Sequence, residues 1–596
     1  MQADATQAKR KMSSSLLSNR GVRTVGFILL IYMVTAVVIT YPGVLAYSHA
    51  ALGLPGDLFQ NLWNIMWVQG WIAGRHALYF TPLEYYPTGA NLAWETLSLP
   101  GTLVAALLRP AIGLAAAYNT VLLASLVADG LAMRALARTV GLSRLGAALA
   151  GLTFMTSPYF VGQLLGHVNM VGAFGVPWFL AALWRLYQQP RAPLRQYLGL
   201  AAILALTTYL VQDYALYAIA AGLVLLWIHP ARPWRTVWAA WVQWGSGIIA
   251  YAALVSPQVY AMLYGPLAVH AGAVQPLTTP WVVDLEGLVL PQPWGLFAGL
   301  ANYWRLAPDL VDGGVFPGFI LWGAALLLVV KRRQLSPPHR TIAGVAAIGT
   351  ALFAVLSLGP VLHVAAHTTS ISLPDRILAS LPLWQDTWPE RLAMMTALFG
   401  ALLVGVAAEW ARTHLDRQAK DRPRGRNIVL AGSLLLILAA SWTEGFPATP
   451  IPAVPYAQAV RRVGGTVLYV PAVMPGTTMT YGPFNYIYVE GVLGVPTPEG
   501  YVSRIPTQTR ARLDRSVVLK YLWGVQFARN PAAMYAASAA VMLPHYLRKH
   551  DVHSIAFLAV SDVAHPGLTV AWLRAHLGAN WIMRRYGTTT LFLRGP

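Results

Sequence analysis

Long apolar stretches separated by short polar segments dominate the first three quarters of this 596-residue sequence. Stretches of roughly 17 to 25 residues, the length that crosses a bilayer as a helix, recur from about Val25 to about Ser441. The pattern predicts a mainly α, polytopic transmembrane helical bundle. Eleven spans are predicted, near residues 25–45, 116–137, 145–164, 169–187, 196–212, 214–229, 236–262, 313–330, 341–362, 391–411 and 427–443.

The distribution of Lys and Arg between the connecting segments predicts how these spans are oriented. Twenty-three Lys and Arg residues lie on the side that holds the N-terminus, and five lie in the opposite loops. Those five are Arg75, Arg109, Arg305, Arg376 and Arg391. Because cytoplasmic loops are enriched in Lys and Arg, the N-terminus is predicted to be cytoplasmic and the C-terminal region exterior. The apolar run 97–113 is predicted to be re-entrant or interfacial, since a crossing there would export Arg134, Arg138 and Arg144.

The first span could also be read as a signal peptide. A basic cytoplasmic segment, residues 1–24, precedes it, and Ser48 and Ala50 after it resemble a small-residue cleavage site. Its apolar stretch of roughly 20 residues is longer than the core of a signal peptide, which has about 7–15 residues. An uncleaved anchor is therefore predicted.

The composition indicates a membrane protein and limits the kinds of site that it can contain. With 56% hydrophobic residues, 11% charged residues and a mean hydropathy of +0.52, the chain is too apolar for a soluble protein of this length. Its 42 Lys and Arg against 22 Asp and Glu give a formal charge of +20. This excess arises mainly in the cytoplasmic loops, which indicates contact with anionic lipid headgroups rather than nucleic acid. The absence of cysteine excludes disulfides, thiol catalysis and thiolate metal sites.

The chain divides into a transmembrane domain, residues 25–445, and a C-terminal region. Two long exterior loops, about 46–115 and 263–312, interrupt the transmembrane domain. After a Pro-rich linker that cannot be helical, residues 446–596 are predicted to form a small exterior α/β domain. Its predicted helices are 458–463, 507–521 and 568–577, and its predicted strands are 466–470, 554–560, 581–585 and 589–593, the last two in a hairpin around Gly587.

The first exterior loop contains the most informative acid of the chain. A Pro-Gly pair ends one segment, and apolar residues at helical spacing predict an amphipathic helix beginning at Asp57. The tryptophans of this helix, Trp63, Trp67 and Trp71, recur every fourth residue and are predicted to lie at the lipid headgroups. Asp57 could cap this helix, act as a functional carboxylate, or do both.

Several short motifs, spread over most of the chain, resemble those of one family. They are Gly56-Asp57-Leu58-Phe59-Gln60, Tyr86-Pro87-Thr88-Gly89-Ala90-Asn91-Leu92, Leu356-Ser357-Leu358-Gly359-Pro360, Trp388-Pro389-Glu390-Arg391 and Gly500-Tyr501-Val502-Ser503-Arg504. Together they make the chain similar to integral membrane glycosyltransferases of the GT-C fold, and in particular to bacterial membrane proteins related to the YfhO family. Enzymes of this fold take sugars from polyprenyl-phosphate carriers.

The resemblance implies an inverting glycosyltransferase of the GT-C type, acting on the outer face of a bacterial cytoplasmic membrane. Its partners would be a polyprenyl-phosphate-linked sugar, membrane lipid and an envelope glycan or protein acceptor, with no nucleic acid. In this fold an acid of the first exterior loop is the catalytic base or a metal-associated carboxylate, and Asp57 matches it. The chain lacks an Asp-x-Asp or Glu-x-Asp pair there, which leaves open whether a divalent cation, Mg²⁺ or Mn²⁺, is a cofactor.

Sugar transfer from a lipid phosphate needs a base for the acceptor hydroxyl and cations for the departing phosphate. Asp57 could supply the base. The candidate cations on the exterior side are Arg75, His76, Arg305, Arg376 and Arg391. Each arginine could instead contact a headgroup or pair with an acid. The local pairs would be Arg391 with Glu390 or Asp386, and Arg376 with Asp375.

Other exterior polar residues could bind the sugar or the acceptor. They are Gln60, Tyr86, Asn91, His167, Asn169, Asp213, Asp284 and Glu286. Tyr86 and Asn91 lie in a run that also fits ordinary turn chemistry, and His167 lies in a hairpin where a structural role is the alternative. In an extended strand Asp284 and Glu286 would share a face, as an acceptor-side or metal-binding pair; a solvated loop is the alternative.

The sequence shows no nucleotide-binding motif, nucleophilic triad or internal repeat, which favours a lipid-linked donor. Two other functions stay open. A transporter or flippase of a lipid-linked envelope precursor predicts ionisable residues within the spans, of which Asp129 is the clearest. A non-catalytic scaffold for envelope assembly would use Asp57 for no chemistry.

Overall fold

The computed structural model describes residues 19–595 apart from 96, 190–191, 229–239, 269–281, 291–315, 317, 366, 382, 385–386, 419–424, 442–444, 474–484, 503–504, 528–529, 531 and 559–565. The chain forms two compact units. The first comprises Met1–Ala46, Thr120–Tyr251 and Gln275–Pro447, and the second comprises Tyr47–Asn119, Ala252–Val274 and Ala448–Pro596.

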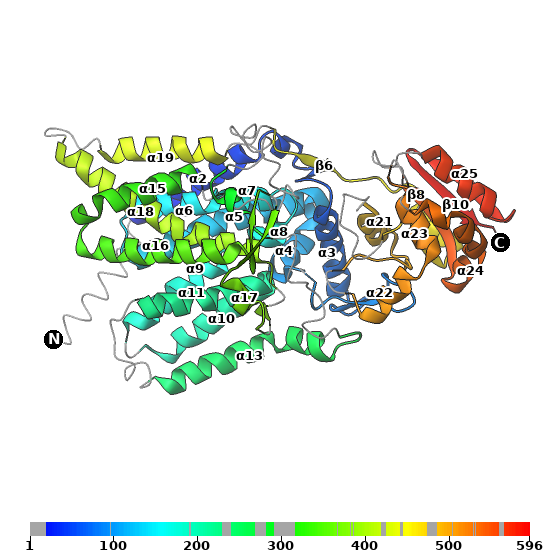
Figure 1. Ribbon diagram of the computed structural model, residues 1–596, viewed down its shortest axis with the longest axis horizontal. Helices are drawn as coiled ribbons and strands as arrows, with labels where there is room; N and C mark the ends of the chain where they lie inside the picture. Colours follow the sequence, from blue (N-terminus) through cyan, green and yellow to red (C-terminus); the bar gives the residue numbers. More distant parts are fainter. Residues whose placement is uncertain are drawn as a thin grey trace. The chain divides into compact units, whose positions relative to one another are not determined.

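The first unit is a bundle of apolar helices (Figure 1). They are α2 (Asn19–Ile39), α6 (Arg144–Met155), α7 (Pro158–Gln163), α8 (Val168–Val171), α9 (Gly175–Gln188), α10 (Leu194–Leu210), α11 (Gln212–Ile228), α15 (Phe319–Lys331), α16 (Pro337–Ser357), α17 (Asp375–Leu378), α18 (Ala393–Gln418) and α19 (Gly425–Ser441), with most of α5 (Leu114–Thr139) and the beginning of α13 (Trp241–Tyr264). Short 3-10 helices are η1 (Gly43–Ala46), η2 (Leu285–Leu288), η3 (Arg332–Gln334) and η5 (Pro389–Leu392). After α16, β4 (Val361–Val364) and β5 (His367–Ser372) form a small antiparallel hairpin.

Each predicted span coincides, for most of its length, with a helix of the described residues. In the part of the chain that the structure describes, six helices are long and apolar enough to cross a membrane: Leu114–Thr139, Arg144–Gln163, Val168–Gln188, Trp241–Tyr264, Pro337–Ser357 and Pro389–Gln418. Shorter apolar helices include Arg23–Ile39, Leu99–Ile112, Gln212–Leu226 and Asn427–Ile437. The predicted mainly helical membrane fold is therefore confirmed.

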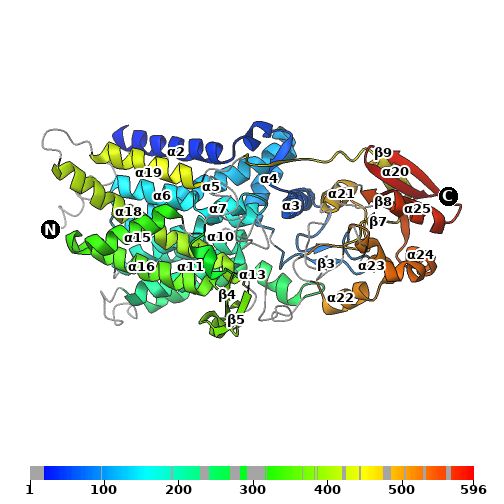
Figure 2. The ribbon, with the colours of Figure 1, turned by 45° about the horizontal axis from the view of Figure 1, so that its top comes forward.

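Helix α18 is the centre of the first unit. Its most apolar part is buried along its whole length, against α6, α15, α16 and α19 (Figure 2). Two glycines allow α18 to approach α6 closely: a Cβ atom added to Gly405 would lie 2.9 Å from the carbonyl oxygen of Gly146 and 2.7 Å from Leu142 Cδ1. Small residues at helix contacts let the backbones approach, which is how helices in membranes gain packing energy.

We expect Gly405→Ala to destabilise this bundle. The added methyl group meets a backbone oxygen that cannot rotate away, and overpacking of this kind costs about 1–3 kcal/mol. The matched control is Gly432→Ala in α19, where an added Cβ meets nothing within 4 Å. The control should be neutral or slightly stabilising, because alanine favours a helix over glycine. Thermal unfolding of both purified variants in detergent checks this, and equal Tm values would contradict it.

The second unit combines the first predicted exterior loop with the C-terminal region. Its elements are β1 (Ala50–Leu52), α3 (Asp57–Ile72), β2 (Phe80–Thr81), β3 (Ala90–Asn91), α4 (Leu99–Ile112), β6 (Ala448–Pro450), α20 (Ala457–Val463), β7 (Thr466–Val470), α21 (Asn485–Leu493), α22 (Thr507–Asp514), α23 (Val517–Gly524), η6 (Ala533–Tyr535), α24 (Ala536–Lys549), β8 (Val552–Leu558), α25 (Pro566–His576), β9 (Trp581–Tyr586) and β10 (Thr589–Arg594). Strand β1 pairs antiparallel with β6, so the two regions share a small sheet as well as a compact unit.

The C-terminal region is built on a four-stranded sheet in the order β7-β8-β10-β9. Strand β7 is parallel to β8, and the β8-β10 and β10-β9 pairs are antiparallel. The hairpin between β9 and β10 turns at Gly587, whose φ of 57° suits glycine. The predicted strands and the first and last predicted helices are confirmed. The predicted helix 507–521 is wrong in one respect: it breaks at Ser516, whose side chain accepts a hydrogen bond from Leu519 N–H and caps α23.

The tryptophan stripe of α3 lies inside the protein. Trp63 and Trp67 are 3% and 5% exposed, and their rings stack with centroids 5.0 Å apart. Trp63 Nε1 donates to Glu490 of α21, whereas Trp71 is partly exposed. The prediction that this stripe lies at the lipid headgroups is therefore wrong for Trp63 and Trp67, because α21 packs against α3 at Trp63 and the His76 ring stacks on Trp67.

Candidate functional site

Within the second unit, the turn before β3 pairs through its backbone with a segment of the C-terminal region. Tyr85 N–H donates to the carbonyl oxygen of Glu499 at 2.7 Å, and Tyr86 N–H donates to that of Thr497 at 2.8 Å. In return, Thr497 N–H donates to the carbonyl oxygen of Leu83 at 2.7 Å. These three bonds hold residues 83–86 beside 497–499.

Side chains reinforce this pairing. Arg512 of α22 donates from Nη1 to Thr88 Oγ1 at 2.9 Å and from Nη2 to the Tyr85 carbonyl oxygen at 3.0 Å. A Cβ atom added to Gly500 would lie only 2.6–2.8 Å from atoms of the buried Tyr85 ring. The glycine at this position is therefore required by the close approach of Tyr85.

The pairing places Tyr501 against Asp57. The Tyr501 hydroxyl donates to Asp57 Oδ1 at 2.9 Å, and Tyr501 N–H donates to Glu84 Oε2 at 3.0 Å. Asp57 is the half-buried first residue of α3, where the positive end of the helix dipole favours a carboxylate. The cap residue is Gly56, with φ 126°, so the prediction that Asp57 caps the helix is wrong. Instead, its carboxylate is oriented by the C-terminal region.

Four glutamates are buried in the same unit: Glu84, Glu95, Glu490 and Glu499. Gln60 Nε2 donates to Glu95 at 2.8 Å, and the backbone N–H groups of Tyr469 and Val473 donate to Glu499. Burial raises the pKa of Glu499 and the pKa of Glu490 to about 8 each. Burial also raises the pKa of Glu84, as do the nearby Glu490 and Glu95 charges. At neutral pH the carboxyl groups of Glu490 and Glu499 therefore favour the protonated form.

We expect the second unit to become less stable as the pH rises from about 5 to about 8. In this window the folded protein holds protons on Glu490 and Glu499, whereas an unfolded glutamate, with a pKa of 4.5, does not. The free energy of unfolding therefore falls as the pH rises. Glu490→Gln keeps the acceptor for Trp63 but cannot ionise, so it should raise the Tm at pH 8 and flatten the pH dependence.

Thermal unfolding in detergent at pH 5 and pH 8 measures this effect. The control is Asp551→Asn, which also removes one carboxylate, but from an exposed side chain that pairs with His553. The control should leave the pH dependence in place. A wild-type protein that is equally stable at both pH values would contradict the expectation.

The other candidate substrate-binding residues of the first exterior loop differ in their contacts and positions. Asn91 Nδ2 donates to the carbonyl oxygens of Ala261 and Pro266, and its Oδ1 accepts from Ala93 N–H. Asn91 thus ties the loop to the end of α13. Gln60 lies one helical turn beyond Asp57, and Tyr86 is half-buried beside Tyr85.

Arg75 and His76 lie beyond the far end of α3 from Asp57. The helix has 16 residues, so it separates its ends by roughly 24 Å. The His76 ring stacks on Trp67 with centroids 3.6 Å apart, and Arg75 is exposed. The structure does not bring these two candidates together with Asp57.

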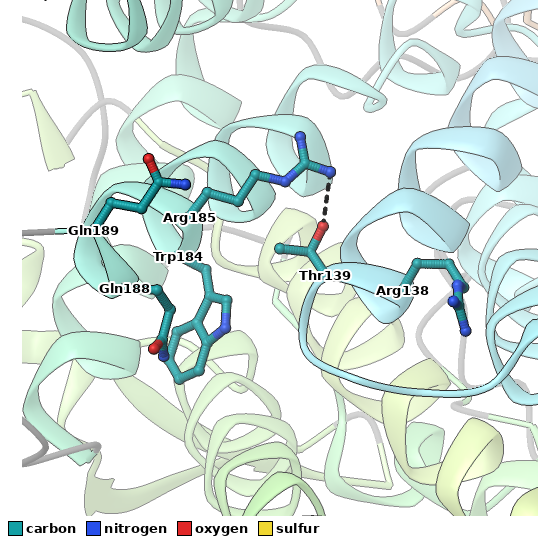
Figure 3. A pocket seen from close by; sticks show the side chains of 6 residues that line it. All are labelled: Arg138, Thr139, Trp184, Arg185, Gln188 and Gln189. Atoms are coloured by element: carbon teal, nitrogen blue, oxygen red, sulfur yellow. Dashed lines mark hydrogen bonds between the residues drawn. The ribbon is translucent and has the colours of Figure 1, made fainter. Parts of the chain in front are cut away.

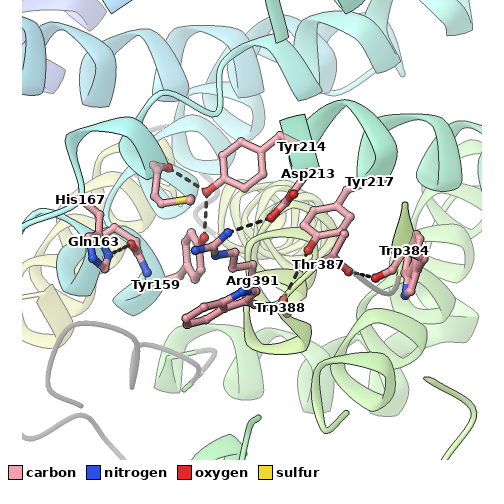
Figure 4. Close-up of polar contacts among 11 residues, drawn as sticks. Tyr159, Gln163, His167, Asp213, Tyr214, Tyr217, Trp384, Thr387, Trp388 and Arg391 are labelled. Atoms are coloured by element: carbon pink, nitrogen blue, oxygen red, sulfur yellow. Dashed lines mark hydrogen bonds and ion pairs between the residues drawn. The ribbon is translucent and has the colours of Figure 1, made fainter. Parts of the chain in front are cut away.

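The first unit holds a separate polar cluster at the beginning of α11 and α18 (Figure 4). Arg391 Nη1 forms an ion pair with Asp213 Oδ2 at 2.8 Å and lies over the Trp388 ring. The Tyr214 hydroxyl donates to the carbonyl oxygen of Met170 at 2.8 Å. The Tyr214 hydroxyl has one proton, and the Met170 contact uses it. The Tyr159 hydroxyl, 2.8 Å from the Tyr214 hydroxyl, therefore donates the hydrogen bond between these two tyrosines.

The remaining candidates of this unit have structural partners. His167 Nδ1 contacts Gln163 Oε1 at 2.8 Å (Figure 4), and Asn169 is buried in α8. Arg376 donates to Ser372 Oγ. Asp375 accepts from Trp384 Nε1. The local pair predicted for Arg376 with Asp375 is therefore wrong. The pair predicted for Arg391 with Glu390 or Asp386 stays a prediction, and Asp386 and Arg305 lie outside the described residues.

Asp284 and Glu286 do not form a strand. Asp284 is the N-cap of η2, and its Oδ1 accepts from Glu286 N–H at 3.0 Å and Ala365 N–H at 3.1 Å. The prediction that they share a face of an extended segment is wrong, because the aspartate caps a helical turn instead. The part of the second long loop that follows, residues 291–315, lies outside the described residues.

The described residues do not form a metal site. Among the described residues there is no group of three or more His, Asp or Glu side chains that could hold a metal ion. Asp57 is oriented by a phenol, and Asp284 by two backbone N–H groups. We therefore assign no step to a divalent cation.

The structure adds three residues that sequence reasoning did not place in the site: Tyr501, Glu84 and Glu490. Tyr501 had a weak signal, since it lies in the motif Gly500-Tyr501 that supports the family resemblance. Glu84 lies two residues before the motif that begins at Tyr86, and no motif includes it. Nothing local to Glu490 marks it, because its role depends on α21 packing against α3.

Comparison with known proteins gives a match of fold. No protein-family model and no curated protein matches the sequence. Among solved structures, the chain is similar to the arabinofuranosyltransferase AftD from Mycobacteria, with a TM-score of 0.55 and 13% identity, over 96% of this chain and 42% of AftD. The chain thus spans less than half the length of that protein.

Two further structures are more distant. The oligosaccharyltransferase AglB from Archaeoglobus fulgidus, in complex with an inhibitory peptide and a dolichol-phosphate, gives a TM-score of 0.45 at 13% identity over 95% of this chain and 74% of AglB. ArnT from Cupriavidus metallidurans, bound to undecaprenyl phosphate, gives a TM-score of 0.39 at 14% identity, over 97% of this chain and 100% of ArnT. The conclusion about fold rests on AftD: this chain has a GT-C-like membrane fold.

Proposed function

We propose that the protein is a membrane glycosyltransferase of the inverting GT-C type. It moves a sugar from a polyprenyl-phosphate carrier to a cell-envelope acceptor on the outer face of a bacterial cytoplasmic membrane. The observation that carries this proposal is the Asp57 carboxylate, held by the Tyr501 hydroxyl at 2.9 Å at the start of α3, on a fold shared with a glycosyltransferase.

In the proposed reaction Asp57 acts as general base. It takes the proton of an acceptor hydroxyl while the acceptor oxygen forms a bond to the anomeric carbon of the sugar. The bond from that carbon to the phosphate oxygen breaks on the opposite face, and the lipid phosphate leaves with the electron pair. The proton then passes from Asp57 to water, so the charges balance.

The Tyr501 hydroxyl favours the charged form of the base. A hydrogen bond donated to a carboxylate stabilises its ionised state, and two contacts of the same tyrosine fix its position: its hydroxyl on Asp57 and its N–H on Glu84. Tyr501 is thus a positioning residue for Asp57.

The remaining parts of the proposal rest on the sequence. The donor class and the likeness to YfhO-related proteins come from the motif resemblance, and the outer-face location comes from the distribution of Lys and Arg. The name of AftD supports sugar transfer in general. The cation that stabilises the departing phosphate stays a prediction.

We expect Asp57→Ala and Asp57→Asn to abolish transfer. Loss of a general base lowers kcat by about 10²–10⁴-fold. The assay incubates the purified protein with polyprenyl-phosphate sugars and cell-envelope acceptors and follows the product. Asp416→Asn serves as control, since it removes an acid that pairs with Arg412 on the surface of α18 and should leave activity unchanged. Full transfer by Asp57→Ala would disprove the catalytic assignment.

We expect Tyr501→Phe to lower kcat by about 10- to 150-fold with little change in KM. The substitution removes one hydrogen bond to a charged group, a loss of about 1.5–3 kcal/mol, and it leaves the backbone contact with Glu84 intact. The matched control is Tyr586→Phe in β9, whose ring lies beside Tyr456. If both variants have the same kcat as the wild type, Tyr501 does not position the base.

The same preparation distinguishes the two alternative functions. A flippase would move a lipid-linked sugar across vesicle membranes without forming a product, and this would contradict the proposal. A scaffold would support envelope assembly in cells that carry Asp57→Ala, whereas the proposed enzyme would not.

A further inference from the structure

A polar cavity lies in the first unit, at the C-terminal ends of α5 and α9 (Figure 3). Its volume is about 330 Å³, which falls at the lower end of the range for small-molecule sites, about 300–1,000 Å³. It is lined by Arg138, Thr139, Trp184, Arg185, Gln188 and Gln189. The proposed transfer reaction uses none of these residues.

Among the described residues, no acid neutralises the charge of the two arginines of this cavity. Arg185 Nη2 donates to Thr139 Oγ1 at 3.0 Å, and Arg138 Nη1 donates to the Leu142 carbonyl oxygen. Each guanidinium has five N–H donors, so these contacts use a small part of them. No carboxylate lines the cavity, and within the described part of the chain neither arginine forms an ion pair.

Contacts within the protein explain only part of this arrangement. An arginine near a helix C-terminus can donate to the last carbonyl groups, as Arg138 does. Arg185 instead reaches from α9 to a side chain of α5, the hydroxyl of Thr139 (Figure 3). Arg134 lies within electrostatic range of Arg138 and Arg144, so the surroundings add positive charge. The cavity thus presents planar donors to an anion.

The position of the cavity along the helices indicates which anion is at hand. The segments Leu114–Thr139 and Val168–Gln188 are both long and apolar enough to cross a membrane, and the ends of such spans lie at the depth of the lipid headgroups. Trp184 suits this layer as well, since tryptophan concentrates at membrane interfaces. Basic pockets between spans bind the phosphate of anionic lipids.

We propose that this cavity binds the phosphate of an anionic phospholipid headgroup, with Arg138 and Arg185 as the ligands of the phosphate oxygens. Guanidinium groups match phosphate geometry with two parallel hydrogen bonds. Thr139 orients Arg185, and Gln188 and Gln189 lie where the polar part of the headgroup would extend.

Native mass spectrometry of the detergent-purified full chain tests this proposal with three probes: dioctanoyl phosphatidylglycerol, dioctanoyl phosphatidylcholine and inorganic phosphate. The test variant is Arg138→Gln with Arg185→Gln. The control, Arg332→Gln with Arg333→Gln in η3, removes the same charge from exposed residues elsewhere in this unit. A third variant, Arg138→Lys with Arg185→Lys, keeps the charge and loses the fork of donors.

We expect phosphatidylglycerol to bind the wild type and the control, and to bind the test variant about tenfold or more weakly. The lysine variant should fall between them, which also excludes a folding defect as the cause. Equal loss in test and control variants would overturn the proposal in favour of unspecific charge. Binding of inorganic phosphate without phosphatidylglycerol, or equal binding of phosphatidylcholine, would overturn it too.

Discussion

The second unit depends on three backbone hydrogen bonds between residues 83–86 and 497–499. They turn a loop near the N-terminus and a segment near the C-terminus into one structural element. Two residues beyond this pairing, Tyr501 reaches an aspartate 444 positions away in sequence. The carboxylate that is proposed as the base therefore has no fixed environment until the C-terminal region has folded onto the loop. The close fit of Gly500 to Tyr85 leaves no room for a side chain there.

Bringing these segments together buries several acids, and the two units accommodate their acids differently. In the second unit, Glu490 and Glu499 are fully buried among tyrosines and tryptophan, and their raised pKa values keep them protonated near neutral pH. In the first unit, Asp213 forms an ion pair with Arg391. A buried charge is tolerated with an ion-pair partner and otherwise avoided by protonation. Asp57 is half-buried and accepts a hydrogen bond from the Tyr501 hydroxyl, which is compatible with the role of base proposed for it.

Local patterns in the sequence predict local structure. This explains which of the sequence-based predictions are confirmed and which are wrong. Apolar length and the position of Lys and Arg are properties of single segments, and the predicted spans coincide with helices. Asp57 stands out because a charge there interrupts apolar surroundings. Tyr501 could not be found in this way, because a pairing between distant backbones leaves no periodic trace in either segment.

The same limit explains the misplaced residues. A tryptophan at every fourth position predicts a covered face, but not whether lipid or α21 covers it. Asn91 and Asp284 have side chains that bind sugars or metals equally well, yet both serve to bind backbone groups of their own unit. Helix α24 contains Pro544, which in a sequence indicates a break, and packing against β8 and α23 supports the helix despite it.

Within the first unit, the arginines near the two ends of α9 differ in their partners. Near its beginning, the Met170 carbonyl oxygen accepts from Tyr214, in the cluster where Arg391 is paired with Asp213. At its other end, Arg185 and the neighbouring Arg138 have no acid among the residues that line their cavity. A paired arginine is stable without any outside partner, whereas an arginine without a carboxylate partner needs water or an anion to compensate its charge. At one end of α9 the arginine is therefore paired within the protein. At the other end the charge of the two arginines is best neutralised by phosphate from a surrounding membrane.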